Sequence, residues 1–179
     1  VKEMTQELML GAGCFWCIEA AYLRVKGVIN VEPGYSGGHS STPSYQDVCR
    51  GITGHAEVIK LQYDDNIIST REILEIFFTL HDPTQLNRQG YDVGTQYRSA
   101  IFFYNDKQRV IADKLIQEIN HDSIWPEPIV TEVSPAQEFY VAEQAHKDYF
   151  NNNSESQYCQ LVISPKLAKF KQTFANNLK

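Results

Sequence analysis

The sequence predicts an α/β (α+β) fold, a two-layer sandwich in which helices pack on one mixed β-sheet. Segments with the pattern of strands alternate with segments of helical period, in the order β-α-β followed by β-α-β-α-β. Turn-forming residues separate these segments, and no internal repeat or long Ser/Pro/Gly linker divides the chain. At 179 residues and 42% hydrophobic composition, the chain can bury a sizeable core. We therefore expect one domain over residues 1–179, with 151–179 as a C-terminal extension.

The N-terminal part of the chain predicts three strands and a helix. The first strand is expected at Leu8–Ala12, a short apolar run closed by small residues. A helix should follow, because apolar residues recur there at helical spacing and form one stripe; they are Ile18, Ala21, Tyr22 and Val25. Val28–Glu32 is predicted as a strand and Pro33–Tyr45 as a loop rich in turn formers. Ala56–Tyr63 alternates with period two, which is typical of a half-buried strand.

The middle of the chain predicts two helices and two further strands. Thr70–Leu80 has helical periodicity, and His81–Gln96 has none and is predicted as a long loop. Ser99–Tyr104 is β-prone and should form a strand. Lys107–Ile119 is predicted as a helix whose inner side carries Val110, Ile111, Leu115 and Ile119. Ile129–Val133 is predicted as one more strand.

The C-terminal part has a weaker pattern. Asn151–Ser154 is predicted as a polar connector, and Leu161–Ile163 as a short strand. Pro165 is then expected to open a last amphipathic helix, because proline suits the first helical turn. Its apolar residues are Leu167, Phe170 and Phe174.

Composition excludes several classes of partner. The net charge is −6, and no basic block suggests a nucleic-acid partner. No window has the roughly 18 apolar residues of a membrane span. Four cysteines are too few for a disulfide-stapled secreted scaffold, so we expect a reducing, cytoplasmic setting. Nothing in the sequence suggests an obligate dimer, and we expect a monomer.

The stretch from Gly13 to Cys17 holds the candidate nucleophile. It lies where the first strand turns into the first helix, so Cys14 is expected in the first helical turn. Backbone N–H groups and the positive end of the helix dipole stabilise an anion there, and a thiol can ionise below its usual pKa of about 8.5. The alternative is a small buried cysteine that fills a gap in the core. Phe15 and Trp16 favour the first interpretation, because two large aromatic residues at a helix start suit the wall of an apolar pocket.

This stretch resembles the signature of a known enzyme family. Gly13-Cys14-Phe15-Trp16 followed by Glu19 is similar to the signature of A-type methionine sulfoxide reductases, the peptide-methionine (S)-S-oxide reductases. Four more segments match in the family's order: Gly34-Tyr35-Ser36-Gly37-Gly38, Pro43-Ser44-Tyr45-Gln46-Asp47-Val48, Gly54-His55-Ala56-Glu57 and Gly94-Thr95-Gln96-Tyr97-Arg98-Ser99. The resemblance implies an α/β sandwich around a ferredoxin-like core. It also implies a thiol-dependent reductase that repairs methionine S-sulfoxide, free or in oxidised proteins.

Reduction of a sulfoxide by a thiol needs a thiolate, a proton for the leaving oxygen and a pocket for the S-methyl group. Cys14 can supply the thiolate, and Phe15 with Trp16 the pocket. Glu57 is the candidate acid, because desolvation at the mouth of an apolar strand would raise its pKa and keep it protonated. The alternative is an ordinary strand glutamate that faces Lys60 or solvent. The match to the family's Gly-His-Ala-Glu motif favours catalysis.

Three further residues take their expected roles from the resemblance. Tyr45 and Tyr97 match family positions that bind the sulfoxide oxygen together with the glutamate, and a phenol can donate such a hydrogen bond. Either tyrosine alone would more often be a packing residue. Asp92 matches a carboxylate that organises bound water and substrate.

The partner of Cys14 departs from the commoner family pattern, in which position 17 is glycine and tail cysteines recycle the enzyme. Here Cys17 stands at that position, and Cys159 matches the first tail cysteine. Cα atoms three residues apart in a helical turn lie about 5–6 Å apart, within disulfide range. We expect Cys17 to resolve a Cys14 sulfenic acid first, with Cys159 as the alternative or as a second relay toward thioredoxin. The reductant is then thioredoxin or another dithiol, with no cofactor.

The cysteines and His55 also have possible roles in metal binding or packing. Cys14 and Cys17 could form half of a zinc site, but Cys49 and Cys159 stand alone, so no metal is expected. Cys49 is expected to be a small buried hydrophobic residue, and His55 a structural hydrogen-bonding residue.

Two other functions stay open at this level. A general thiol–disulfide oxidoreductase would use Cys14 and Cys17 alone and would not depend on Glu57. The bulky residues between the two cysteines argue against it. A non-catalytic domain would use the aromatic pocket to recognise an apolar side chain, and it would tolerate Cys14→Ser.

Overall fold

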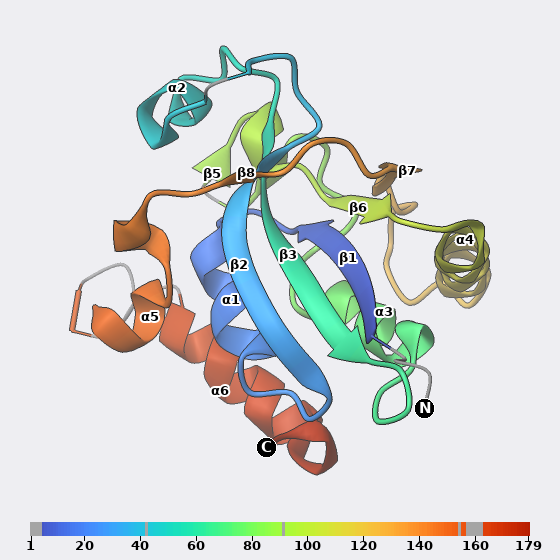
Figure 1. The fold of residues 1–179 in the computed structure, drawn as a ribbon. Coiled ribbons are helices and arrows are strands. Elements are labelled where there is room, and N and C mark those ends of the chain that lie inside the picture. Colours follow the sequence, from blue (N-terminus) through green and yellow to red (C-terminus); the bar gives the residue numbers. More distant parts are fainter. Residues whose placement is uncertain (1–4, 42, 91, 154, 157–162) are drawn as a thin grey trace.

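A six-stranded mixed sheet forms the centre of the molecule, as Figure 1 shows for the computed structural model, which describes residues 5–41, 43–90, 92–153, 155–156 and 163–179. The strand order is β7–β6–β1–β3–β2–β8. Neighbouring strands run antiparallel except β6 and β7, which pair in parallel. The bounds are β1 Thr5–Gly11, β2 Val28–Ser36, β3 Ala56–Asp64, β6 Ala100–Phe103, β7 Glu132–Pro135 and β8 Tyr140–Val141. The predicted mixed sheet is confirmed.

The central part has the ferredoxin-like connectivity that the resemblance implied. In chain order it runs β1, α1 (Phe15–Tyr22), β2, β3, α3 (Thr70–Thr79) and β6. The four strands lie in the order β6–β1–β3–β2. In the unit β1–α1–β2 the two strands are separated by β3, and in the unit β3–α3–β6 they are separated by β1. Further elements are α2 (Tyr45–Cys49), the hairpin β4 (Arg88–Gln89) and β5 (Asp92–Val93), α4 (Asp106–His121), α5 (Tyr149–Asn152) and α6 (Ser164–Thr173). The hairpin lies inside the predicted His81–Gln96 loop.

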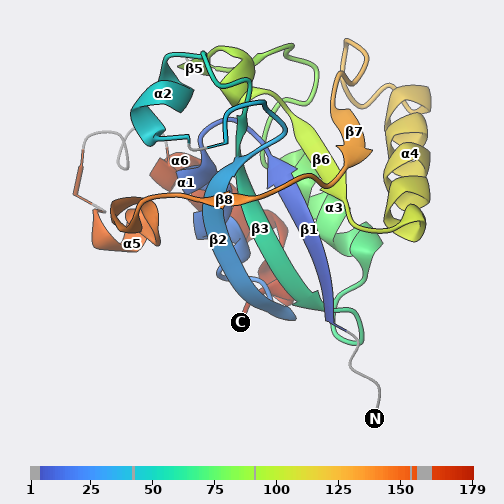
Figure 2. The ribbon, with the colours of Figure 1, turned by 45° about the horizontal axis from the view of Figure 1, so that its top comes forward.

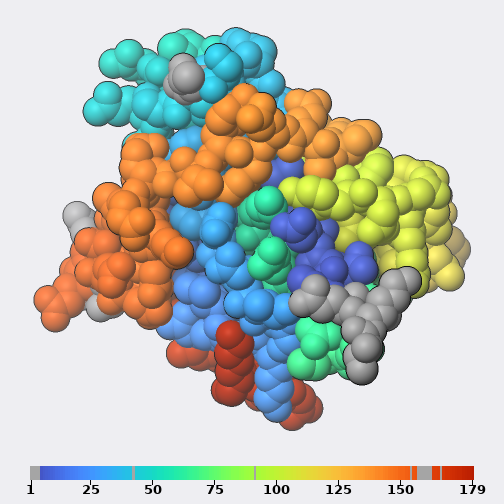
Figure 3. Space-filling view, in the orientation of Figure 1, coloured from blue at the N-terminus to red at the C-terminus, as the bar shows by residue number. Residues whose placement is uncertain are grey.

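The core lies between the sheet and its helices. Leu8 and Leu10 of β1 face the helices and belong to the large core cluster, whereas Met9 points to the other face of the sheet. Figures 1 and 2 show α1, α3 and α6 behind the sheet. On the opposite face, the chain around β8 crosses over β2, as the space-filling view in Figure 3 shows. The helices therefore cover one face and loops partly cover the other, which is the predicted two-layer arrangement.

Three strands differ from the prediction. β1 begins at Thr5 and not at the predicted Leu8, because residues 5–7 pair with the end of β3. β2 continues through Ser36, because the first residues of the predicted Pro33–Tyr45 loop pair with β3. β7 begins at Glu132 instead of Ile129, since the N–H of Ile129 donates to Oδ1 of Asn120 and takes no part in the sheet.

The inner face of α4 also differs from the prediction. Val110, expected to point inward, is 48% exposed. Gln108 is buried instead, because its Nε2 donates to the carbonyl of Glu7 and to the hydroxyl of Tyr63. A buried amide with satisfied hydrogen bonds can thus replace an apolar residue on the inner face of a helix.

The C-terminal segments flank α1. α5 takes up the first residues of the predicted Asn151–Ser154 connector. Ile163 has helical dihedral angles and caps α6, so it does not end the predicted Leu161–Ile163 strand. The other two residues of that strand and Cys159 lie outside the described residues. The last helix is confirmed, with Leu167 and Phe170 buried in the main core.

The ends of four strands lie together along one edge of the sheet, the edge that runs across the strands and carries their connecting loops. β1 and β2 end there, β3 and β6 begin there, and the loops from this edge carry α2, β5 and the start of α1 (Figure 2). Within the described ranges, no helix has both the length and the apolar character needed to cross a membrane. The loops at this edge carry most of the residues that the sequence singled out.

Candidate active site

Cys14 lies at the start of α1 and is almost buried, with 7% of its surface exposed. It is the N-cap residue, with φ −66° and ψ 126°, one position before the helical turn in which the sequence placed it. Gly13 before it has φ +84°, and a Cβ there would lie 2.7 Å from Cβ of Gln89. Only glycine suits this turn, which brings Cys14 to the end of the helix where N–H groups point outward. The N–H of Cys17 donates to the carbonyl of Cys14 at 3.2 Å.

Glu57 reaches the same point from the start of β3 and is 1% exposed. Its Oε1 accepts a hydrogen bond from the N–H of Phe15 at 3.2 Å. Its Oε2 is buried and has no hydrogen-bond partner among the described residues. Burial raises the pKa of Glu57, the Phe15 N–H opposes the rise, and the charges of Asp92 and Cys17 add to it. The resulting pKa is about 8. The group is therefore a neutral acid near pH 7, with one oxygen unused.

Two phenols stand beside this acid. Tyr45 begins α2, and Tyr97 ends a 3₁₀ turn over Thr95–Tyr97. Burial raises the pKa of each phenol well above its usual value, and the charge of Glu57 contributes to both shifts. Both hydroxyls therefore remain protonated and can donate hydrogen bonds.

Cys49 at the end of α2 also belongs to this group, although the sequence suggested only a buried packing residue. It is only partly buried, and its thiol is hydrogen-bonded by both Tyr45 and Tyr97. Burial raises the pKa of Cys49. Nε2 of Gln96 donates to the Cys49 carbonyl at 3.0 Å and ties the 3₁₀ turn to the end of α2. The two phenols are thus held together through Cys49 and its backbone.

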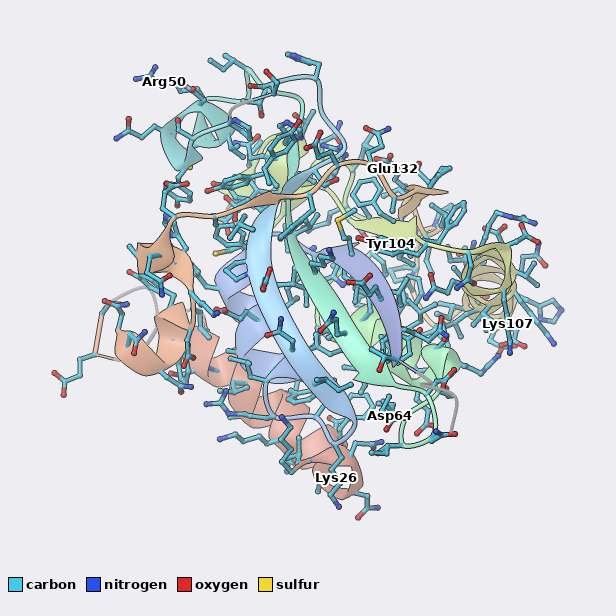
Figure 4. The ribbon with its side chains drawn as sticks, viewed as in Figure 1. Lys26, Arg50, Asp64, Tyr104, Lys107 and Glu132 are labelled. Atoms are coloured by element: carbon cyan, nitrogen blue, oxygen red, sulfur yellow. The ribbon has the colours of Figure 1, made fainter. Side chains whose placement is uncertain are left out.

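Arg98 joins the loops on the other side of the site. Its guanidinium donates to the carbonyls of Gly54, Thr95 and Gly37 and pairs with the Glu132 carboxylate, with Nε to Oε1 at 2.9 Å. Figure 4 shows Glu132 at the β7 side of this edge of the sheet and Arg50 at the opposite side, pointing out from α2. The loop before Glu57 and the turn that bears Tyr97 are therefore held by one side chain.

The aromatic residues after Cys14 form a stack of which only part reaches the surface. Phe15 is fully buried, with its ring centroid 5.7 Å from that of Tyr35 and 6.3 Å from that of Tyr45. Trp16 is partly exposed and lies 6.2 Å from Tyr45, stacked. The sequence predicted that Phe15 and Trp16 together form the wall of an apolar pocket. The structure buries Phe15 behind the site and leaves Trp16 as the accessible wall.

Trp16 is held by residues from the far end of the chain. Its Nε1–H donates to Nδ1 of His146 at 3.2 Å, and its ring stacks on Tyr149 with centroids 3.8 Å apart at 9°. Burial lowers the pKa of His146, while the charge of Glu143 opposes this effect. The bond requires a neutral imidazole, because Nδ1 must carry no proton in order to accept the hydrogen bond from the indole N–H. Sequence reasoning missed His146 and Tyr149, which lie in a stretch without periodicity.

The remaining predicted residues fall into two groups. Asp92 lies on β5, close enough for its charge to raise the pKa of Glu57 and of Tyr97. Cys17 lies in the first turn of α1, whereas Cys159 is outside the described part of the chain. No cluster of three or more metal-binding side chains occurs in the described ranges. The structural role expected for His55 is confirmed, since its ring bonds the N–H of Gly38 and the carbonyl of Ser40.

Comparison with known proteins covers almost the whole chain. The family model for peptide methionine sulfoxide reductase matches residues 6–178. The peptide methionine sulfoxide reductase MsrA of Saccharolobus solfataricus is 55% identical over 170 residues, which cover 95% of each chain. The reduced form of Mxr1 from Saccharomyces cerevisiae is similar in structure, with a TM-score of 0.79 and 34% identity over 87% of this chain and 90% of that chain. The complex of Mxr1 with Trx2 is similar with a TM-score of 0.56 and 24% identity, over 83% and 89% of the two chains.

We expect Glu57→Gln to make the folded protein relatively more stable as the pH rises. The native pKa of about 8 lies above the ordinary value of 4.5, so between these values the native state holds a proton that the unfolded chain has released. The stability that this proton confers is complete below pH 4.5 and is lost as the pH rises through 8. Glutamine has no such loss.

Urea unfolding between pH 5 and pH 9 measures the effect. The variant's free energy of unfolding, relative to the unsubstituted protein, should rise by about 1.4 kcal/mol per pH unit and level off above pH 8. A difference that does not change with pH would contradict a buried, protonated Glu57.

Proposed function

The chain belongs to the peptide methionine sulfoxide reductase family and is a reductase of methionine sulfoxide, and we propose that Cys14 is its nucleophile and Glu57 its acid. One observation carries this assignment. A buried carboxyl with a raised pKa and an unused oxygen is hydrogen-bonded to the residue directly after Cys14. An acid that must protonate a leaving oxygen at neutral pH needs such a pKa.

The first step is a two-electron oxygen transfer. The Cys14 sulfur attacks the sulfoxide sulfur while Glu57 donates a proton to the sulfoxide oxygen. An S–S bond forms first. It breaks together with the substrate's S–O bond as the hydroxyl moves to the Cys14 sulfur, and the proton released by the Cys14 thiol returns to Glu57. Methionine leaves as a thioether, and Cys14 remains as a sulfenic acid.

The phenols and the aromatic wall orient the substrate. Tyr45 and Tyr97 are proposed to donate hydrogen bonds to the sulfoxide oxygen, for which their raised pKa values suit them. Trp16 is proposed to contact the S-methyl group, with the buried Phe15 behind it. Asp92 is proposed to organise water and substrate near Glu57. Preference for the S epimer is proposed from the resemblance to A-type reductases alone.

Recycling is proposed to pass through Cys17. The Cys17 thiol attacks the Cys14 sulfenic acid, an S–S bond forms, and water leaves. The i to i+3 bond from the Cys17 N–H to the Cys14 carbonyl supports this pairing, because it holds the two residues in one turn. Cys159 is the alternative first partner or a later relay.

A dithiol of the thioredoxin class is proposed to reduce the disulfide. The yeast protein Mxr1, which is similar in structure, has been solved in complex with Trx2. No prosthetic cofactor takes part in these steps. The proposed substrates are methionine sulfoxide free and in oxidised proteins, so the role is protein repair.

Cys14→Ser should abolish methionine formation and leave the fold intact. Serine is close to cysteine in shape but is a far poorer nucleophile at this site. Methionine released from methionine S-sulfoxide in the presence of dithiothreitol measures the effect, and the same assay on the unsubstituted protein tests the proposed function itself. Residual turnover above about one per cent would remove Cys14 from this role.

Glu57→Gln should slow the reductive step by roughly 10²- to 10⁴-fold, the range typical of general acid catalysis. Substrate affinity should change far less, because glutamine keeps the shape of the side chain. Single-turnover kinetics separate the two effects. Single-turnover rates close to those of the unsubstituted enzyme would show that another group supplies the proton.

Cys17→Ser should prevent the disulfide that one substrate turnover generates, and Cys159→Ser should retain it. Mass spectrometry of the singly oxidised protein identifies the linked cysteines. If Cys159→Ser instead leaves Cys14 as a sulfenic acid with Cys17 reduced, the tail cysteine resolves it and Cys17 is a pocket residue.

A further inference from the structure

Glu19 is a buried carboxyl that the mechanism does not use. It lies on α1, one turn after Trp16, and is 1% exposed. Its Oε2 accepts a hydrogen bond from the N–H of Asp148 at 2.8 Å, and its Oε1 accepts from the N–H of Tyr149 at 3.4 Å. Burial raises the pKa of Glu19 to about 7, and the two N–H groups oppose the rise. Burying an acidic group costs free energy unless hydrogen bonds compensate for the lost water.

The backbone that Glu19 binds has an uncommon conformation. Asp148 has φ 51° and ψ 42°, in the left-handed region that residues with a Cβ adopt only rarely. Such a conformation persists where surrounding contacts hold it. Both N–H groups that donate to Glu19 lie at this point, one on Asp148 itself and one on Tyr149.

The same segment holds the indole of Trp16. Tyr149 donates its backbone N–H to Glu19, and its ring stacks on Trp16 with centroids 3.8 Å apart. His146 accepts a hydrogen bond from the indole N–H. Trp16 and Glu19 are three residues apart on α1, so they lie on one side of the helix. One residue of α1 therefore binds the backbone of the segment, while the side chains of that segment bind another residue of α1.

We propose that Glu19 is a positioning residue for Trp16, the residue proposed to contact the S-methyl group. Glu19 fixes the backbone at residues 148–149 against α1, and Tyr149 of that segment fixes the indole of Trp16. The link to substrate rests on the proposed function, because it needs Trp16 to contact the S-methyl group. The link from Glu19 to Trp16 rests on the geometry alone.

Fluorescence of Trp16 tests the geometric part without any substrate. The chain has two tryptophans, and Trp125→Phe leaves Trp16 as the single reporter. In that background, Glu19→Leu keeps the bulk of the side chain and removes both acceptors, and Glu19→Gln keeps one. We expect acrylamide quenching of Trp16 to increase in the order unsubstituted, Gln, Leu, because the ring loses its stacked neighbour.

A matched control separates this effect from general destabilisation. Glu72 of α3 also accepts a backbone N–H, that of Ser69, and is exposed and part of a different helix. Glu72→Leu should leave Trp16 quenching unchanged. Unchanged quenching in Glu19→Gln, or equal quenching changes in the Glu19 and Glu72 variants, would overturn the proposal. Should Glu19→Leu fail to fold, the Gln variant still decides.

Kinetics test the link to substrate. Loss of an apolar contact made equally before and during reaction raises KM and spares kcat. We expect Glu19→Leu to raise KM for methionine sulfoxide roughly fivefold and to leave kcat within about twofold, since one methyl contact is at stake. Trp16→Ala should raise KM at least as much. If Trp16→Ala leaves KM unchanged, the proposed pocket is wrong, whereas a quenching change in the Glu19 variants would still support the positioning role.

Discussion

The hydrogen bond from the Phe15 N–H to Glu57 is the contact on which the rest of the site depends. It joins the first residue of α1 to the second residue of β3, 42 positions later in the chain. Two elements of the ferredoxin-like core therefore meet at one oxygen atom, next to Cys14. Because β1 and β3 are also neighbours in the sheet, the position of this contact is set by strand pairing and not by a flexible loop.

The other functional groups are arranged around this rigid pair by loops that hold one another. Arg98 binds three carbonyls from separate turns, and Gln96 joins the turn of Tyr97 to the end of α2. The phenols thus approach the acid from segments that have little regular structure but many internal hydrogen bonds. Such loops can present donors at a defined place while the core below carries the stability.

Most of the core and the turn at Cys14 could be predicted from the sequence, because they follow from local pattern. Tyr45, Tyr97 and Asp92 were expected at the site only because their motifs resemble those of a known family. Period two places Leu8 and Leu10 on one face of β1, and the glycine before Cys14 marks the turn. Pattern could not place Val110, because the burial of Gln108 depends on partners in other strands. It could not place His146 either, because the hydrogen bond from Trp16 to His146 spans 130 positions of the chain.

The near-complete burial of Glu57 has a consequence for the movement of protons. The carboxyl proton of such a buried residue exchanges slowly with solvent wherever exchange requires water to reach the carboxyl. Under the proposed mechanism it has no need to exchange during oxygen transfer, since the proton that leaves the Cys14 thiol can reload the carboxyl and the carboxyl's proton can pass to the sulfoxide oxygen. Protons then pass only between the Cys14 thiol, the Glu57 carboxyl and the sulfoxide oxygen, and water neither supplies nor takes up a proton. Solvent would enter the cycle only when water leaves as the disulfide forms.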